Sequence, residues 1–301
     1  MSPSTPIRLV ALDLDGTLLD SKSQISPRTR QAIVDAVGRG VIVLPCTGRP
    51  LASLPPLVAQ LPGIRYAITA NGAAVWDMGT DPLGAVYSRY SDAPQRPTHE
   101  PVLLERHYLP PETAREVFAL YREYHGPLSI FSDGRSYLDG TGMTLFQDRH
   151  IQRHSTEARQ PDDGRTHVVR DLDEWMSRHA HEVEKFCMFF DSIEIAQAAL
   201  VRFRAFPGIE AVQGAPDNVE VTAQGVDKGT ALLALADMLG IPREATAAIG
   251  DSENDRAMLA RAGVAAVMAN ALPEIRALGD IVSTCDNDHD GVAELFERLG
   301  L

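Results

Sequence analysis

The apolar residues near the N-terminus fall in short continuous runs, and amphipathic segments or turns separate these runs. Such runs are typical of strands that are buried on both faces. Ser26 and Pro27 open the first amphipathic segment, because serine often caps a helix and proline fits its first turn. This alternation predicts a parallel sheet with helices on its faces. The strands are expected at 7–13, 41–49 and 66–73, and the helices after Pro27 and over 51–60.

The pattern changes in the middle of the chain, where residues 79–101 are rich in proline, glycine, aspartate and serine. A helix, a hairpin, a strand, a second helix and another hairpin are expected after this segment. Together they indicate an α+β domain that is separate from the first sheet. The helices are expected at 111–125 and 192–205, the strands at 127–133, 135–140, 181–190, 209–213 and 218–222, and a loop at 152–166.

The strict alternation returns in the last third of the chain, which therefore completes the first sheet. The sequence predicts an α/β core formed by residues 1–85 and 216–301, split by an inserted α+β domain at 86–215. The expected helices of the last part are 228–240, 253–263, 272–279 and 290–300, and its expected strands are 245–251, 264–270 and 280–284.

Composition and charge limit the classes of molecule that this protein is expected to bind. Across 301 residues the formal net charge is -13, which disfavours nucleic-acid binding, because that needs a basic patch or stripe. The three cysteines, Cys46, Cys187 and Cys285, are too few and too widely spaced for a disulfide framework or a zinc site. We find no signal-peptide pattern and no apolar run of the roughly 18 residues that span a membrane. We expect a cytoplasmic protein that acts on a small molecule, and we make no prediction of its oligomeric state.

Two carboxylates follow the first expected strand. Asp13 and Asp15 are two residues apart, so in extended backbone they point the same way from the carboxyl end of that strand. Ligands of open parallel sheets bind at this edge, and Gly16 allows a sharp turn there. Neighbouring anions repel and raise each other's pKa. On these residues alone, a cation site and a simple Asp-Gly turn are both open.

Polar residues at the ends of other expected strands favour the functional reading. The hydroxyl of Thr47 and the backbone N–H groups around Gly48 can receive a phosphate, although most such pairs are turns. Lys228 opens a helix, where a cation meets the positive end of the helix dipole unless a phosphate is its partner. A dense acidic group suits a hard cation such as Mg²⁺, or caps a helix. This group contains Asp251, Glu253, Asn254 and Asp255.

The segments DLDGTLL, TGR, KG and GDSENDRAML, in this order, resemble the four motifs of the haloacid dehalogenase superfamily. The NGA that follows the third strand, the insertion, and DHDGVAELFERL near the C-terminus resemble its Cof-like sugar-phosphate phosphatase branch. The resemblance covers the whole split core. It implies a Rossmann-like parallel-sheet core with a cap domain inserted after the third strand.

The resemblance also implies the chemistry and the residues that carry it. It implies an Mg²⁺-dependent phosphatase that forms an aspartyl-phosphate on Asp13. It makes Asp15 the general acid and base, and crowding anions and burial are then expected to raise the pKa of Asp15. Mg²⁺ would be held by Asp13, the backbone carbonyl of Asp15 and Asp251. Phosphate binding is implied for Thr47, Gly48, Lys228 and Asn254, and supporting roles for Asp255, Asn71 and Gly72.

Two other functions stay open beside hydrolysis of small phosphorylated metabolites, of which sugar phosphates are the first expectation. A phosphomutase would use the same chemistry, and a sensor would bind a phosphometabolite without turnover. The substrate could also be a nucleotide, a flavin or pyridoxal phosphate, or a phosphoglycerate derivative. Arg135, Tyr137 and residues 141–149 are candidates for the pocket wall, whereas His150, His154, His179, His181, Trp76, Trp175 and the loop 286–290 are expected to be structural or solvated.

Overall fold

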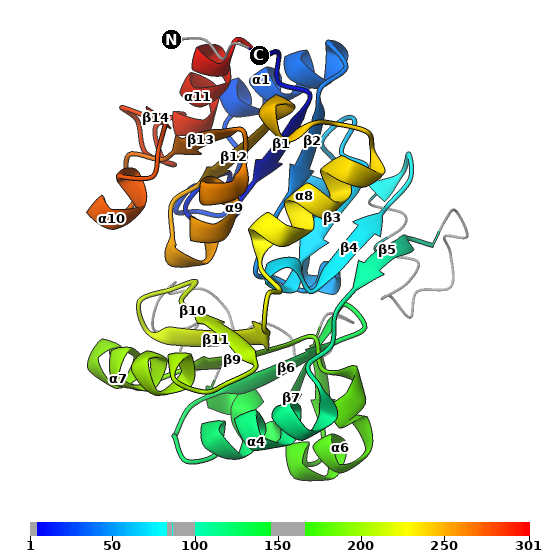
Figure 1. The fold of residues 1–301 in the computed structure, drawn as a ribbon, viewed down its shortest axis with the longest axis vertical. Helices are drawn as coiled ribbons and strands as arrows, with labels where there is room; N and C mark the ends of the chain where they lie inside the picture. The colour runs from blue at the N-terminus through cyan, green and yellow to red at the C-terminus, as the bar shows by residue number, and fades with distance from the viewer. Residues whose placement is uncertain (1–4, 83–85, 87–99, 146–165) are drawn as a thin grey trace.

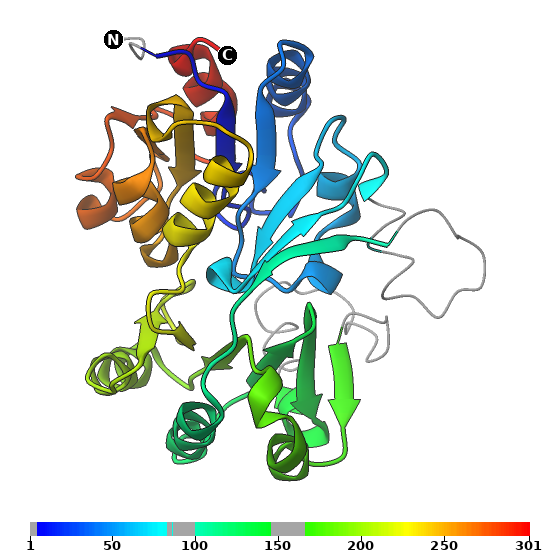
Figure 2. The ribbon, with the colours of Figure 1, turned by 45° about the vertical axis from the view of Figure 1, so that its right-hand side comes forward.

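The chain folds into two parts that lie one above the other in Figure 1 and are joined by two crossings of the chain. The structure is a computed structural model, and it describes residues 5–82, 86, 100–145 and 166–301. The upper part contains both chain ends, and the lower part is made of the middle of the sequence (Figures 1 and 2). This arrangement is that of a core interrupted by an inserted domain.

A parallel sheet forms the centre of the upper part, with the strand order β14-β13-β12-β1-β2. Strand β1 pairs with β2 on one side and with β12 on the other, so residues from both ends of the chain share one sheet. Every residue of β1 is buried, as its continuous apolar run predicts. The strands are β1 (Leu9–Leu12), β2 (Ile42–Pro45), β12 (Thr246–Gly250), β13 (Val264–Val267) and β14 (Ile281–Val282).

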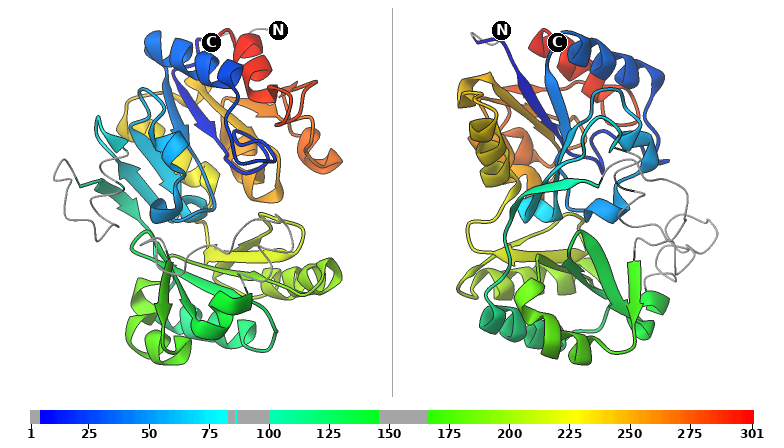
Figure 3. Two further views of the ribbon diagram at one scale, coloured as in Figure 1. Left: turned by 180° about the vertical axis from the view of Figure 1, so that it is seen from behind. Right: turned by 90° about the vertical axis from the view of Figure 1, so that its right-hand side faces the viewer.

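Helices cover both faces of this sheet (Figures 1 and 3). Alternate residues of β1 enter different cores: Val10 packs with the helices α1 and α11, and Leu9 with α8 and α9. The expected helix at 253–263 is a 3-10 turn, Glu253–Asp255, followed by α9. The helices are α1 (Pro27–Gly38), α8 (Lys228–Met238), α9 (Arg256–Arg261), α10 (Pro273–Arg276) and α11 (Gly291–Leu299).

The expected helix over 51–60 is wrong. The segment forms a 3-10 turn, Leu51–Ser53, and the single helical turn α2, Pro56–Ala59. Leu54 between them is extended, and two prolines follow it. A proline disfavours the helical conformation of the residue before it, which explains the break.

The third expected strand, β3, belongs to a different sheet from the one predicted. It pairs antiparallel with β4, which pairs with β5, and it meets the parallel sheet through a bridge between Cys46 and Ile68. Trp76 of β4 is fully buried here and its indole donates to the hydroxyl of Thr69, so its expected packing role is confirmed. The strands are β3 (Tyr66–Thr69), β4 (Ala74–Asp77) and β5 (Val102–Arg106).

The inserted domain contains a six-stranded sheet with the order β10-β11-β9-β6-β7-β8. Its helices lie on the face turned away from the core (Figures 1 and 2). Strand β8 and helix α6 were not expected, and the predicted loop 152–166 falls outside the described residues except at its last position. The strands are β6 (Leu128–Ser132), β7 (Arg135–Asp139), β8 (Thr166–Val169), β9 (Lys185–Phe189), β10 (Ile209–Val212) and β11 (Asn218–Ala223), and the helices α4 (Pro111–Tyr121), α6 (Leu172–His179) and α7 (Ile193–Arg204).

Strand pairing moves both ends of the insertion relative to the expected boundaries. β11 pairs with β10 and β9, so the inserted sheet runs to Ala223 and not to 215. β5 pairs with β4 on the core side, so the first crossing lies after Arg106 and not after 85. Composition marks a change of region, but hydrogen bonding between strands decides where a sheet ends. Within the described ranges no helix is long and apolar enough to cross a bilayer, and the cytoplasmic location stays a prediction.

Candidate active site

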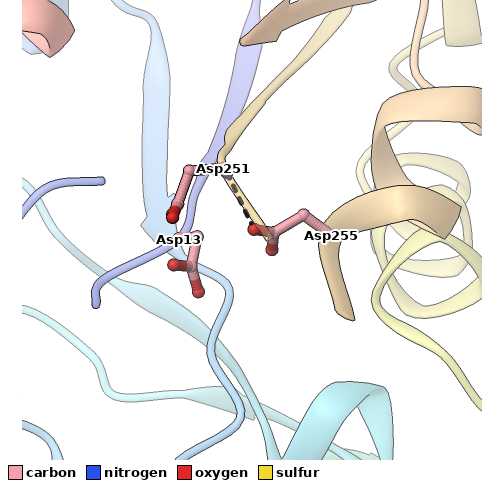
Figure 4. A group of neighbouring side chains, drawn as sticks. All are labelled: Asp13, Asp251 and Asp255. Atoms are coloured by element: carbon pink, nitrogen blue, oxygen red, sulfur yellow. Dashed lines mark hydrogen bonds between the residues drawn. The ribbon is translucent and has the colours of Figure 1, made fainter. Parts of the chain in front are cut away.

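The carboxyl ends of β1, β2 and β12 meet at the edge of the parallel sheet that faces the inserted domain (Figure 1). Asp13 follows β1 and Asp251 follows β12, and the register places Leu12 beside Ile249 in these two strands. Asp255 lies on the 3-10 turn after β12, and Figure 4 shows the three carboxylates gathered at this edge. Parallel pairing therefore brings together residues that are more than two hundred positions apart in the sequence.

Lys228 lies at the centre of this group. Its Nζ donates to Asp13 Oδ1 at 2.6 Å and to Asp255 Oδ1 at 2.7 Å, and its side chain is fully buried. Burial alone would lower the pKa of Lys228, but the two carboxylates outweigh this effect and raise it, so the amine stays protonated. The carboxylates thus offset the unfavourable end of the helix dipole at the start of α8.

The pKa of Asp13 lies well above its ordinary value. Burial is the largest cause, and the charge of Asp255 adds to it, while Lys228 acts in the opposite direction. Lys228 therefore offsets part of the cost of burying the charge of Asp13, and a bound metal cation would offset more of it.

Asp251 is held by residues that follow both β1 and β13. Thr17 Oγ1 donates to Asp251 Oδ1 at 2.7 Å, and Asn270 Nδ2 donates to Asp251 Oδ2 at 3.4 Å and to the carbonyl of Gly16 at 2.8 Å. Gly16 has a φ of +84°, and a Cβ there would lie 2.6 Å from Asp251 Oδ2, so only glycine fits. Burial, and then the charge of Asp255, raises the pKa of Asp251 to about 7.

These carboxylates suit a divalent cation. One oxygen each from Asp13, Asp251 and Asp255 lies within 4.8 Å of the others, and a small all-oxygen donor set is what Mg²⁺ prefers. Both oxygens of Asp255 are already engaged, one by Lys228 and the other by the backbone N–H groups of Asp251 and Ser252. Asp13 and Asp251 are therefore the better candidates for direct ligands, and Asp255 orients them.

The expected increase in the pKa of Asp15 is wrong. Desolvation acts to raise it, but the hydrogen bonds and charge of Arg49 outweigh desolvation and leave the pKa lowered. The guanidinium binds both oxygens, with Nε at 2.8 Å and Nη2 at 2.5 Å. The side chain of Asp15 is still 56% exposed, so water weakens both effects.

The residues expected to bind phosphate lie around the same edge. Thr47 is buried after β2, and its hydroxyl accepts a hydrogen bond from the backbone N–H of Arg49 at 3.1 Å. Asn254 Nδ2 donates to Asn71 Oδ1 at 3.4 Å. Gly72 has a φ of +97°, and a Cβ there would lie 2.3 Å from the carbonyl oxygen of Asp227. The structure thus places Asn71 at the site. It also explains why residue 72 is a glycine, because a side chain there would collide with the backbone of Asp227.

Several site residues were missed by sequence reasoning. Thr17 and Arg49 belong to the motifs DGT and TGR. Their positions next to the expected site residues could have predicted that they also lie at the site. Asn270 follows the end of β13, the edge at which the other site residues lie. Lys185 and Glu220 come from the inserted domain, and their signal was a charged residue beside apolar ones, Lys185 before Phe186 and Glu220 between two valines.

The expectations for the pocket wall and for the histidines had different outcomes. Tyr137 stacks on His167 and packs against Trp175 on the helix side of the inserted sheet, so its expected place in the pocket wall is wrong. His179 also packs on Trp175 and contacts Glu182, which supports a structural role. Residues 146–149, His150 and His154 lie outside the described residues, and Arg135 contacts His167.

Comparisons with known proteins identify the family of this chain. A family model described as haloacid dehalogenase-like hydrolase matches residues 10–87 and 98–296. The chain is 30% identical over 311 residues to Phosphatase YwpJ of Bacillus subtilis (strain 168), covering 97% of this chain and 100% of that protein. It is 27% identical to 5-amino-6-(5-phospho-D-ribitylamino)uracil phosphatase YcsE of the same organism, covering 97% and 95%. A solved haloacid dehalogenase-like hydrolase from B. subtilis matches with a TM-score of 0.77 and 26% identity, covering 97% and 100%.

Proposed function

The chain belongs to the haloacid dehalogenase-like hydrolases and is a phosphatase of that family, and from this premise we propose its mechanism and substrate class. It is an Mg²⁺-dependent enzyme that cleaves the phosphate monoesters of small metabolites through a phosphoaspartate on Asp13. The observation that supports this most strongly is the buried group in which Lys228 bridges Asp13 and Asp255 beside Asp251.

Asp13 acts as the nucleophile. Its carboxylate oxygen forms a bond to phosphorus as the bond to the leaving oxygen breaks, which divides hydrolysis into two easier steps. Lys228 holds Asp13 Oδ1 and carries the positive charge that favours an approaching anion. Mg²⁺ bound at Asp13 and Asp251 would offset repulsion from the phosphate and stabilise charge on its oxygens. The phosphate itself is bound by Thr47, Gly48, Lys228 and Asn254.

Asp15 moves the proton in both steps. As an acid it protonates the leaving oxygen, and as a base it takes a proton from the water that attacks the phosphoaspartate. The pairing with Arg49 favours the ionised form, which is the base. The acid step needs the protonated form, and the negative charge of a bound phosphate favours it because like charges raise a carboxyl pKa.

The substrate is a small phosphorylated metabolite, and a phosphorylated sugar or sugar-like polyol is our first choice. The name of the relative YcsE states that it acts on 5-amino-6-(5-phospho-D-ribitylamino)uracil, whose phosphate is carried by a ribityl chain. The inserted sheet faces the phosphate site and supplies the wall against which a leaving group would lie (Figure 1). We keep the mutase and the sensor as alternatives that the first experiment separates.

The first experiment measures phosphate release from a panel of sugar, polyol, nucleotide, flavin and pyridoxal phosphates, with Mg²⁺ and with EDTA. We expect turnover of at least one sugar or polyol phosphate, lost with EDTA. Isomerised sugar phosphate without released phosphate would instead identify a mutase. Tight binding without any turnover would identify a sensor.

The pKa of Asp251 predicts how pH changes Mg²⁺ binding. A proton and Mg²⁺ compete for the carboxylate, so with a pKa of about 7 the apparent affinity should be about tenfold weaker at pH 6 than at pH 8. We expect Mg²⁺ to raise the melting temperature, relative to EDTA at the same pH, more at pH 8 than at pH 6. Differential scanning fluorimetry measures both shifts without any substrate.

Two variants control this measurement. Asp251→Asn should lose the Mg²⁺-induced shift at both pH values, because the amide is a poorer ligand for a hard cation. Asp237→Asn, at an exposed aspartate of α8, should keep it. An equal Mg²⁺-induced shift at pH 6 and pH 8 in the wild type would contradict the predicted titration.

A further inference from the structure

A second buried cation lies where the inserted domain meets the core. Lys185 is the first residue of β9, and its side chain is fully buried. Its Nζ donates to the carbonyl oxygen of Gly48 at 2.5 Å and forms an ion pair with Glu220 at 3.0 Å. Glu220 Oε2 in turn accepts from Asn71 Nδ2 at 2.6 Å. Two charged residues of the inserted sheet are thus tied to two residues of the core.

The choice of lysine at this position is informative, because the chain contains only three lysines against 25 arginines. Lys22 is exposed, Lys228 lies in the catalytic group, and Lys185 is the third. Burying a charge is costly unless it is paired and hydrogen-bonded. A sequence that otherwise uses arginine places a buried ammonium only at these two positions around the phosphate site.

The space around Gly48 explains the need for a compact cation. A Cβ at Gly48 would lie 3.0 Å from Asn71 Oδ1, 3.2 Å from Glu220 Oε2 and 3.3 Å from Lys185 Nζ. The polar side chains of Asn71, Glu220 and Lys185 therefore pack directly against this glycine. The planar guanidinium of an arginine is larger than an ammonium and would compete for the same space.

Gly48 connects this contact to the phosphate site. Its carbonyl belongs to the peptide whose N–H, that of Arg49, donates to the hydroxyl oxygen of Thr47. Since a peptide unit is planar, a bond that holds the carbonyl also sets the direction of that N–H. Asn71 extends the contact, because its backbone N–H donates to the carbonyl of Thr47 at 3.1 Å and its side chain accepts from Asn254.

We propose that Lys185, paired with Glu220, which Asn71 holds in turn, is a positioning residue through which the inserted domain sets the Thr47–Gly48 phosphate-binding loop. The affinity of the core for phosphate then depends on the docking of the inserted domain. This inference rests on the proposed function, since it assumes that phosphate binds at this loop. It adds a role for the inserted domain that does not involve the leaving group.

The test is Lys185→Met, with inorganic phosphate as the probe. Calorimetric titration should show phosphate binding weakened about tenfold or more, while the Mg²⁺-induced increase in melting temperature is kept, because Lys185 does not contact the three carboxylates. KM should rise by a similar factor for a small ester such as p-nitrophenyl phosphate and for the best metabolite of the panel. Unchanged phosphate affinity, with KM raised for the metabolite alone, would show contact with the leaving group and overturn the proposal.

Glu184→Gln is the matched control. Glu184 immediately precedes Lys185, is fully buried and forms an ion pair with Arg106 at 3.0 Å, also at the junction of the two parts. Its side chain leaves the extended chain on the opposite side from that of Lys185. Removing this charge should leave the phosphate affinity unchanged. An equal loss in Glu184→Gln would show a general effect of buried ion pairs and would also overturn the proposal.

The double variant Lys185→Met with Glu220→Gln keeps the test decisive if the single variant does not fold, because it leaves no unpaired charge. It should bind phosphate as weakly as the single variant. Loss of both phosphate binding and the Mg²⁺ response in this variant would indicate a structural role and count against the inference. A wild-type protein that binds no phosphate and releases none would refute the proposed function instead, so the two failures are distinguishable.

Discussion

Asp13→Asn should lower phosphate release by at least about a thousandfold, because an amide cannot form the phosphoaspartate on which both steps depend. Asparagine keeps the size of the side chain and can still accept a hydrogen bond from Lys228 through its carbonyl oxygen. The loss should therefore appear in kcat, with the fold intact. Steady-state kinetics on the best substrate of the panel, together with the melting temperature, measures both.

Asp237→Asn is the control, since it makes the same change at an exposed position of α8, the helix that begins with Lys228. It should leave kcat and KM unchanged. An Asp13→Asn protein that keeps more than about a tenth of the wild-type kcat would exclude Asp13 as the nucleophile.

Lys228→Met should be the most destabilising single change at this site. It leaves Asp13 and Asp255 buried without their cation, and breaking a buried ion pair costs about 3–5 kcal/mol of unfolding free energy. The loss should grow with pH. Lys228 lowers the pKa of Asp13, so its removal raises that pKa further.

The sign follows from linkage. A carboxyl whose pKa is higher in the folded than in the unfolded chain destabilises the fold as pH rises from about 4 through the folded value. At pH 5 the variant can protonate Asp13 and should lose less stability than at pH 8. Urea unfolding in EDTA at the two pH values measures this difference.

Lys22→Met is the matched control, because Lys22 is exposed and the substitution is the same. Its unfolding free energy should change by less than about 0.5 kcal/mol at either pH. A second variant, Lys228→Met with Asp255→Asn, should recover part of the loss, since it leaves one unpaired carboxylate fewer. A loss in Lys228→Met that is the same at pH 5 and pH 8 would contradict the role of Asp13 as the uncompensated charge.

The hydrophobic pattern gave a wrong prediction where a strand could pair with more than one neighbouring strand. Residues 66–69 have the apolar run of a parallel strand, yet they pair antiparallel with β4 and meet the first sheet at the Cys46–Ile68 bridge. The strand β8 escaped prediction for a related reason, because it is completed by its pairing with β7. The spacing of apolar residues along the sequence indicates a strand or a helix, but it does not indicate which strand will be its neighbour.

The sequence by itself determined the α/β core, the insertion and the set of polar residues at the strand ends. Apolar runs predict β1, β2 and β12, and residues that directly follow parallel strands meet at one edge of the sheet. The positions of Asp13, Thr47 and Asp251 in the chain were therefore enough to predict that they lie at the same edge. Their roles stay predictions until the variants are measured.

Only the tertiary structure decided the electrostatics and the contacts across the two parts. Arg49 lies 34 residues from Asp15, and its hydrogen bonds reverse the expected direction of the pKa shift. Lys185 reaches Gly48 across 137 residues. Charges act through space over a few ångströms, and side chains that lie far apart in the sequence come within that range only when strands from different parts of the chain pair and pack.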